Sequence, residues 1–266
     1  MRIPFDVMKT TFERILTANG FSPSRAEICA ELFSTNSLEG VYSHGVNRFA
    51  PFVEQVQQGV IDPVAEPSLT LANGALEQWN GNSGPGPLNA LAATDRAMEL
   101  AGKNGMGCVA LANSNHWMRA GYYGWRAARA GYLFIGWTNT IPLMPAWGAL
   151  DSRLGNNPMV IAVPYPDGYA APGAENKRAV VLDMAMSQFS YGKMTVHKLS
   201  GEPLPIPGGH DKEGTLTTDP SEILDSGRAL PMGFWKGAAL SLLLDLVASV
   251  LTGGLATHEL GELSQE

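Results

Sequence analysis

The amino-acid sequence predicts a mixed α/β protein with a helical N-terminal lobe and a strand-bearing remainder. A chain of 266 residues with 45% hydrophobic and 16% charged side chains can bury a substantial core, and at this length we expect two lobes with a cleft. Apolar residues recur at helical spacing through the first third of the chain. Short apolar runs bounded by turn residues cluster in the middle, a pattern typical of strands.

Three helices are expected in the first third of the chain. The first spans residues 6–20, the second follows a Ser22 cap and ends near Gly40, and the third ends at Gly59. His44 therefore lies at or just before the N-terminus of the third helix. The apolar stripes are, in order, Met8, Phe12, Ile15 and Leu16; Ile28, Leu32 and Phe33; and Phe49, Phe52, Val53 and Val56.

Strands and helices are expected to alternate in the rest of the chain. A Pro- and Gly-rich connection at 62–87 precedes a helix predicted over 88–102, and an exposed hairpin or loop is expected at 166–178. A final long helix is expected at 234–251. Its most apolar part contains Asp245 and is shorter than the roughly 20 residues of a membrane span, so we expect a buried or interface helix. The predicted strands are Cys108–Ala112, 132–138, 159–163 and 180–184.

Charge and cysteine content argue against several classes of protein. A net charge of −7 argues against nucleic acid as the partner, because phosphate neutralisation needs a basic face. Two cysteines in a chain of this size favour a reduced, intracellular protein with inert thiols. The N-terminus carries acidic residues where a signal peptide needs an uninterrupted apolar stretch. We therefore expect a cytoplasmic protein that binds neither nucleic acid nor a membrane.

The sequence lacks the common fingerprints of nucleotide and metal sites. The Gly-x-Gly-x-x-Gly motif of the Rossmann fold is absent. Gly84-Pro85-Gly86 has a proline between its glycines, and Gly105-x-Gly107 precedes a strand where the motif should follow one. No Gly-Lys-Ser/Thr word of a phosphate-binding loop occurs. The histidines are scattered without the spacing of paired metal ligands, so we expect no metal site.

The segment 43–48 pairs an acid–base group with a holder of carboxylates. If a helix begins near Gly45, His44 and Arg48 project toward the same side, within reach of one small ligand. Histidine can donate a proton to a carbonyl oxygen, and arginine binds a carboxylate through two parallel hydrogen bonds. The alternative interpretation is that His44 caps the helix and Arg48 is a solvated surface charge.

A second histidine, His116, follows the strand predicted at Cys108–Ala112. Polar residues gathered at the C-terminal end of a strand are where α/β proteins tend to place ligand contacts. The alternative is a histidine that is hydrogen-bonded within a turn and packed by Trp117. Asp183 lies inside an apolar strand-like run, where a buried carboxylate needs a histidine, a backbone amide or a cofactor as partner.

Six short segments of the sequence resemble the type-2 malate/L-lactate dehydrogenase family. They occur in the same order and extend over essentially the whole chain. They are GVYSHGVNRF (40–49), NHWMRAGYYGW (115–125), TNTIPLMPAWG (138–148), LGNNPMVIAVP (154–164), LDMAMSQFSYG (182–192) and LPMGFWKG (230–237). The resemblance implies a homodimer with a non-Rossmann, mixed-sheet NAD(P)-binding fold. It also favours a catalytic His44 over a helix cap.

The resemblance assigns roles to particular residues. His44 matches the family's proton donor, and Arg48 and His116 match residues on the substrate side. To these we add Asp183 as an orienter of His44, inferred from its expected burial. The positions that match the family's NAD contacts are Ala179, Val180, Val181, Leu182, Asp183, Met184, Ala185, Trp235 and Lys236.

The expected organisation is a helical lobe at 1–75, with substrate and dimer contacts, and a cofactor-binding domain at 76–266. The expected activity is NADH-dependent reduction of the C2 carbonyl of 2,3-diketo-L-gulonate, giving 3-dehydro-L-gulonate, or of a similar sugar-derived 2-oxo acid. NADPH is the alternative cofactor, because the acidic-residue rule that separates the two belongs to the Rossmann fold.

Other substrates and another class of protein stay open. Malate, lactate, ureidoglycolate or an imino acid would suit the same fold, and a catalytically silent sugar-acid binding protein is the alternative of a different class. The chain also departs from the family in two places. The 166–178 stretch is longer than the family's turn, and relatives continue past Glu266 with segments that complete the cofactor site.

Overall fold

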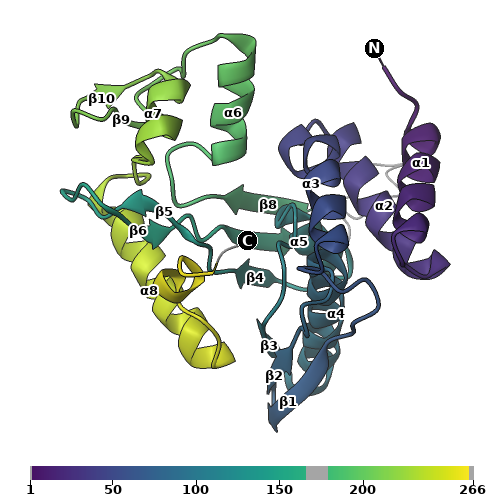
Figure 1. Ribbon diagram of the computed structural model, residues 1–266. Coiled ribbons are helices and arrows are strands. Elements are labelled where there is room, and N and C mark those ends of the chain that lie inside the picture. Colours follow the sequence, from purple (N-terminus) through teal and green to yellow (C-terminus); the bar gives the residue numbers. More distant parts are fainter. Residues whose placement is uncertain (1, 166–178, 264–266) are drawn as a thin grey trace. The chain divides into compact units, whose positions relative to one another are not determined.

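The protein divides into two compact units. The computed structural model describes residues 2–165 and 179–263. The units are Met1–Phe134 with Ala162–Val180, and Ile135–Ile161 with Val181–Glu266. Both contain helices and small sheets (Figure 1), which confirms the predicted mixed α/β class.

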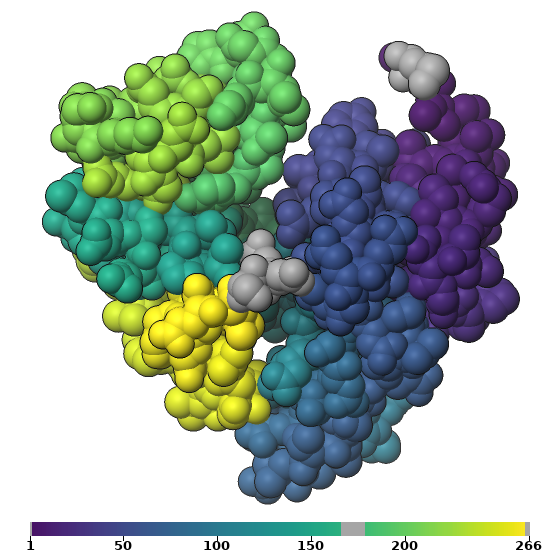
Figure 2. All heavy atoms as spheres, viewed as in Figure 1, coloured from purple at the N-terminus to yellow at the C-terminus, as the bar shows by residue number. Residues whose placement is uncertain are grey.

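Helices α1 (Phe5–Ala18), α2 (Pro23–Leu38) and α3 (Val46–Gln57) confirm the three helices predicted in the first third of the chain. A 3-10 turn, η1 (Tyr42–His44), precedes α3. In the space-filling view α1 and α2 adjoin at the surface (Figure 2, purple). All predicted stripe residues are buried or half-buried except Ile28, which is 42% exposed.

The core between these helices is aromatic. The Phe12 and Phe49 rings stack with their centroids 3.8 Å apart, and the Phe33 ring meets Phe49 edge-on at 5.3 Å. Such pairs add to the hydrophobic effect of burying the rings. The buried face of α2 is centred on Phe33, and Ile28 lies off that face, which explains its exposure.

A three-stranded sheet in the order β1-β2-β3 completes the first unit. β1 (Ser68–Asn73) pairs antiparallel with β2 (Leu76–Asn80), and β2 pairs in parallel with β3 (Cys108–Ala112). Helix α4 (Gly86–Asn104) connects β2 to β3, and α5 (Gly121–Arg129) follows β3. Because β2 and β3 are parallel, the chain leaves both strands at the same edge of the sheet.

The sequence pattern indicated only a connection at 62–87, so β1 and β2 were not predicted. All six residues of β1 are exposed, although Ser68-Leu69-Thr70-Leu71 alternates polar and apolar residues as a half-buried strand does. That alternation and the two-residue turn Gly74-Ala75, with Gly74 at a φ of 61°, were the available signals of a hairpin.

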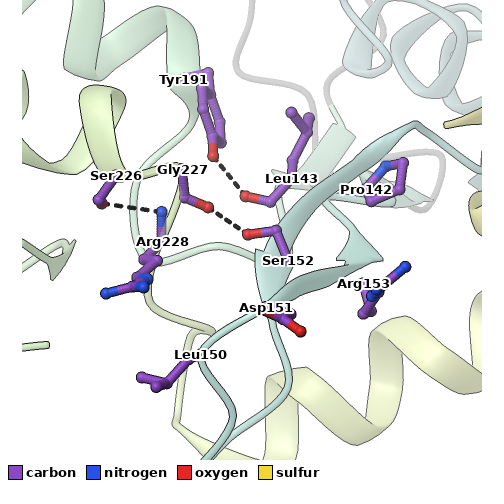
Figure 3. Close-up of a pocket in the computed structure, with 10 residues that line it drawn as sticks. All are labelled: Pro142, Leu143, Leu150, Asp151, Ser152, Arg153, Tyr191, Ser226, Gly227 and Arg228. Carbon is purple, nitrogen blue, oxygen red and sulfur yellow. Dashed lines mark hydrogen bonds between the residues drawn. The ribbon is translucent and has the colours of Figure 1, made fainter. Parts of the chain in front are cut away.

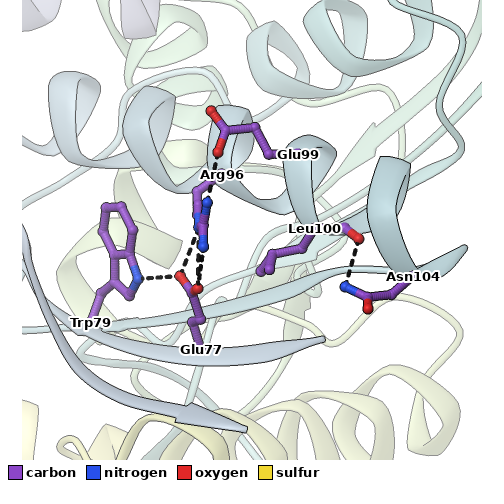
Figure 4. Close-up of polar contacts among 6 residues, drawn as sticks. All are labelled: Glu77, Trp79, Arg96, Glu99, Leu100 and Asn104. Atoms are coloured by element: carbon purple, nitrogen blue, oxygen red, sulfur yellow. Dashed lines mark hydrogen bonds and ion pairs between the residues drawn. The ribbon is translucent and has the colours of Figure 1, made fainter. Parts of the chain in front are cut away.

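A buried ion pair ties β2 to α4 (Figure 4). The Glu77 side chain is 4% exposed, and its carboxylate accepts hydrogen bonds from Arg96 Nη2 at 2.6 Å and from Trp79 Nε1 at 2.9 Å. Arg96 also pairs with Glu99 one turn along the helix, at 2.7 Å. The hydrogen bonds from Arg96 hold the pKa of Glu77 below its usual value, against the opposing effect of burial.

The other predicted strands belong partly to each unit, and the second unit has a methionine-rich core. β4 (Phe134–Trp137), β7 (Met159–Pro164) and β8 (Ala179–Met184) form a sheet in the order β4-β7-β8, through which the division between the units passes. With β3, they confirm the four strands predicted from the sequence. β5 (Pro142–Pro145) pairs with β6 (Ser152–Gly155), and β9 (Gly209–His210) pairs with β10 (Leu216–Thr217). The most buried core side chains include Met144, Met186, Met194 and Ile223.

The helices of the second unit are α6 (Tyr191–Ser200), α7 (Pro220–Ser226), α8 (Trp235–Thr252) and α9 (Thr257–Leu260). The final long helix predicted at 234–251 is confirmed as α8. One side of α8 is buried at Gly237, Ser241 and Leu244, whereas Leu243 and Val250 on the other side are 57% and 78% exposed. By length and composition alone α8 could also span a membrane, a test that core helices of soluble proteins pass too. Its predicted place at an interface stays a prediction.

The division into units differs in position from the predicted boundary at residue 75. That boundary lies inside the first unit, between β1 and β2, because β2 is hydrogen-bonded to both of its neighbours. The predicted roles of 1–75 and 76–266 stay predictions. The hairpin or loop predicted at 166–178 lies outside the described residues.

Removal of Arg96 should leave the buried Glu77 carboxylate without its cation. We expect Arg96→Met to lower the free energy of unfolding at pH 7 by more than the control variant does, because it leaves the Glu77 carboxylate, 4% exposed, without its cation. The control, Arg126→Met, removes an ion pair with Asp95 whose partners are 46% and 42% exposed, and should cost less than about 1 kcal/mol. Urea unfolding measures both values.

The cost of Arg96→Met should also depend on pH. In the wild type, the lowered pKa of Glu77 contributes stability that is present above the pKa of the unfolded chain, about 4.3, and is lost as the pH falls through the folded value. The variant lacks that contribution. The difference between the two proteins should therefore shrink as the pH falls through and below about 4.3, and a difference independent of pH would contradict the assignment.

Candidate active site

Helix α2 positions His44 through a hydrogen bond to its backbone. The Asn36 side chain is fully buried, and its Nδ2 donates a hydrogen bond to the His44 carbonyl at 2.9 Å. The Ser43 hydroxyl lies 2.9 Å from His44 Nδ1. Because a hydroxyl can either donate or accept, this contact survives a change in the protonation state of the imidazole. His44 is thus held both by its backbone and by its ring.

Gly45 allows the His44 turn to lie directly on α2. A Cβ at this position would overlap Ser37 Oγ and would lie 2.9 Å from the Ser37 backbone nitrogen. The Ser37 hydroxyl accepts a hydrogen bond from the Val46 N–H at 2.9 Å and so caps the first turn of α3. The structure therefore assigns the capping role, considered above for His44, to Ser37. α3 begins at Val46 with Gly45 as its N-cap, as the sequence predicted.

His116 lies beside His44, with the ring centroids 5.7 Å apart and the planes tilted by 31°. The Met118 N–H donates a hydrogen bond to His116 Nδ1 at 3.0 Å. A nitrogen that accepts a hydrogen bond carries no proton, so the neutral ring is protonated at Nε2. Desolvation by burial, followed by the nearby charges of Arg48 and His44, lowers the pKa of His116 to about 3.

The alternative interpretation of His116 is also met in part, because the ring does accept a hydrogen bond within its turn. Trp117 stacks on Tyr123 at 5.6 Å, and the Tyr123 hydroxyl donates to the Trp117 carbonyl at 2.5 Å. These contacts fix the turn, and none of them involves Nε2 of His116. The backbone of Met118 adopts a φ of 65°, unusual for a side chain of its size, and Met118 is buried.

Arg48 completes the cluster on the first turn of α3. Its side chain is half-buried, and its charge acts on the pKa of His116. The structure therefore brings together His44 and Arg48, as their spacing predicted, and His116, as the family resemblance implied. A cation, a neutral hydrogen-bond donor and an adaptable acid–base group at one place suit a small oxo acid.

The other predicted site residues lie mainly in the second unit. Asp183 is an exposed residue of β8. Its predicted burial, from which we inferred the orienting role, is therefore wrong. Val180 and Leu182 are exposed at alternate positions of the strand, and Asp183 is exposed next to them. Its pairing with His44 stays a prediction. Trp235 and Lys236 form the first turn of α8, where Trp235 is 62% exposed and Lys236 Nζ lies 6.0 Å from its ring centroid. The Phe234 ring contacts Trp147, with centroids 4.9 Å apart.

A hollow of about 510 Å³ lies in the second unit between the β5–β6 hairpin and the end of α7 (Figure 3). Tyr191 closes one side by donating to the Leu143 carbonyl at 2.5 Å, and Ser152 donates to the Gly227 carbonyl. Its lining contains none of the positions predicted to bind a cofactor. Within residues 2–165 and 179–263, no group of three potential metal ligands occurs.

Sequence reasoning missed the residues that hold the two histidines. Asn36 and Ser37 lie on the buried face of a helix, where polar residues gave no sign of which loop they contact. Met118 acts through its backbone N–H, which no sequence pattern marks. Burial raises the pKa of Cys29 to about 12 and also raises that of Cys108, which supports the expectation of inert thiols.

A model of the malate/L-lactate dehydrogenase family matches residues 3–266. A protein of Escherichia coli O6:K15:H31 named 2,3-diketo-L-gulonate reductase is 45% identical over 262 residues, which are 98% of this chain and 76% of that protein. A protein of the same name from Citrobacter koseri is 45% identical over 259 residues, 97% of this chain and 75% of its own length.

Solved structures of enzymes are similar to this chain over most of its length. The malate dehydrogenase of Entamoeba histolytica has a TM-score of 0.88 at 26% identity and is matched over 96% of this chain and 72% of its own. The Δ1-piperideine-2-carboxylate reductase of Pseudomonas syringae pathovar tomato has a TM-score of 0.87 at 26% identity, over 97% of this chain and 75% of its own.

The His116 ring should stay neutral at physiological pH. We expect ¹⁵N-edited NMR between pH 8 and about pH 5 to show a ring protonated at Nε2 only, with the resonance assigned by its loss in His116→Gln. The unfolded chain binds a proton at a histidine below about pH 6.5, whereas folded His116 does not. His116 should therefore reduce stability as the pH falls below that value, and His116→Gln should remove this part of the pH dependence. An imidazolium pattern near pH 6 would overturn the assignment.

Proposed function

Because the chain belongs to the malate/L-lactate dehydrogenase family, we propose that it reduces the C2 carbonyl of 2,3-diketo-L-gulonate, or of a similar sugar-derived 2-oxo acid, with NADH. Membership of the family makes the chain an oxidoreductase that uses a nicotinamide cofactor and acts on a small acid. The names of the relatives that are 45% identical support the substrate. The observation that carries the proposal is the cluster of His44, Arg48 and His116.

The three residues of the cluster divide the work on a 2-oxo acid. Negative charge develops on the C2 oxygen in the transition state, and His44 would supply the proton that neutralises it. Arg48 would hold the substrate carboxylate. His116, neutral and protonated at Nε2, would donate a hydrogen bond to an oxygen of the substrate without adding a second positive charge.

The residues predicted to bind the cofactor suit a dinucleotide chemically. An exposed aromatic ring at Trp235 can pack against a flat heterocycle, and Lys236 in the first turn of an 18-residue helix can attract a phosphate. β8 is the last strand in the order β4-β7-β8, and its exposed residues Val180, Leu182 and Asp183 would offer further contacts. When bound, the cofactor supplies the hydride. NADPH is the alternative, since none of these contacts separates the two cofactors.

The proposal also includes a cytoplasmic homodimer. The exposed apolar residues of α8, among them Leu243 and Val250, support a surface shared with a second copy. The net charge of −7 supports a small-molecule partner over nucleic acid.

A panel of 2-oxo acids tests the substrate directly. We expect the absorbance of NADH to fall fastest with 2,3-diketo-L-gulonate and more slowly with pyruvate, oxaloacetate and cyclic imino acids. Each acid should be assayed with NADPH as well, which decides the cofactor. Faster turnover of oxaloacetate or an imino acid would assign another substrate within the family. Failure to bind NADH in a titration would favour a silent sugar-acid binding protein.

Substitutions at His44 and Arg48 should affect different kinetic constants. We expect His44→Ala to lower kcat by about 10²- to 10⁴-fold while NADH still binds, because general acid catalysis acts on the chemical step. Arg48→Ala should raise the KM for the oxo acid as well, because a carboxylate holder acts in the ground state too. A near wild-type kcat in His44→Ala would move the proton donor to His116.

A further inference from the structure

We propose that Gly86 and Asn89, in the first turn of α4, are positioning residues that hold the loop 113–118 and thereby set His116 beside His44. The proposal rests on the proposed function only where it predicts an effect on catalysis. Its structural part concerns the ring of His116 in the protein without substrate.

Gly86 lets the loop lie directly on the start of α4. A Cβ at Gly86 would overlap the carbonyl oxygens of Asn115 and His116. Both overlaps are with backbone, which cannot rotate away as a side chain can. Any side chain at residue 86 must therefore push the backbone of His116 away from α4 or displace the helix itself.

Asn89 holds the same loop from three residues further along α4. Its side chain is fully buried, and Nδ2 donates to the Gly81 carbonyl at 2.9 Å and to Ser114 Oγ at 3.2 Å. Gly81 follows β2 and Ser114 follows β3. One buried amide group thus ties together the two loops that leave the parallel strands at the same edge of the sheet.

The loop is also tied to its neighbour along its length. Asn115 Nδ2 donates to the Ser83 carbonyl at 2.9 Å and to the Gly84 carbonyl at 3.1 Å. The Ser83 N–H donates in turn to the Asn113 carbonyl at 3.0 Å. With these ties on both sides, residues 113–118 have little freedom to move independently of α4.

The position of the loop decides the tautomer and the pKa of the His116 ring. The Met118 N–H that fixes the Nε2 tautomer belongs to the same loop, so a shift of the backbone changes the donor and the ring together. The charged or titratable groups that act on the ring are His44 on η1 and Arg48 on α3. A misplacement of about 1 Å in an active site can cost about 100-fold in rate, so small shifts suffice.

Gly86→Ala tests the proposal, with Gly102→Ala on the same helix as the matched control. A Cβ at Gly102 meets only the Tyr132 hydroxyl, at 3.3 Å, and alanine there should favour the helix. In Gly86→Ala without substrate, we expect the ring nitrogens of His116 to change their NMR shifts while the signals of His197, His210 and His258, outside the cluster, keep theirs. We expect kcat/KM for the best 2-oxo acid to fall at least 10-fold, with most of the loss in kcat. Gly102→Ala should stay within twofold of the wild type in kcat/KM and leave the His116 signals unchanged.

Asn115→Ala provides a second test that introduces no overlap. It removes the two hydrogen bonds to the neighbouring loop, and it should move the His116 signals in the same way but less. If Gly86→Ala does not fold, Asn115→Ala decides alone. Unchanged His116 signals in every folded variant would overturn the proposal. Shifted His116 signals in a protein that reduces none of the 2-oxo acids would uphold the positioning role and reject the proposed function.

Discussion

The parallel pairing of β2 with β3 is the constraint on which the histidine cluster depends. Parallel strands end at one edge of a sheet, so the loop that follows β2 and the loop that carries His116 must meet there. Gly86 and Asn89 fix the position of these loops. Helix α2 fixes the position of His44, through the hydrogen bond from Asn36 and the close contact of Gly45 with the helix. The Glu77–Arg96 ion pair holds β2 against the helix that supplies these contacts.

The chemistry of the cluster depends on keeping two similar side chains in different states. Nδ1 of His116 accepts a backbone N–H, which suits only the unprotonated nitrogen, whereas His44 is paired with a hydroxyl that suits either state. Two imidazoles at 5.7 Å can therefore serve as a fixed donor and as a proton carrier, without competing for one proton. Arg48 reinforces the difference, because its positive charge disfavours a second cation at His116.

The sequence was most informative where periodicity and local order decide the structure. The stripes of Phe12 and Phe49 predicted their helices, and the run Cys108–Ala112 predicted a strand with its exact bounds. Proximity of His44 to His116 followed only from resemblance to a family, since it depends on the pairing of β2, a strand with no clear pattern. The exposure of Asp183 was mispredicted, because an apolar run does not say whether another layer covers it.

The order of the chain has a consequence for synthesis on the ribosome. Every hydrogen bond described above that holds the two imidazoles joins residues between Asn36 and Tyr123. All of these residues leave the ribosome before Ile135, where the second unit begins. Domains tend to fold as units, the N-terminal one first. The cluster can therefore be assembled co-translationally, before any predicted cofactor contact of the second unit has been made.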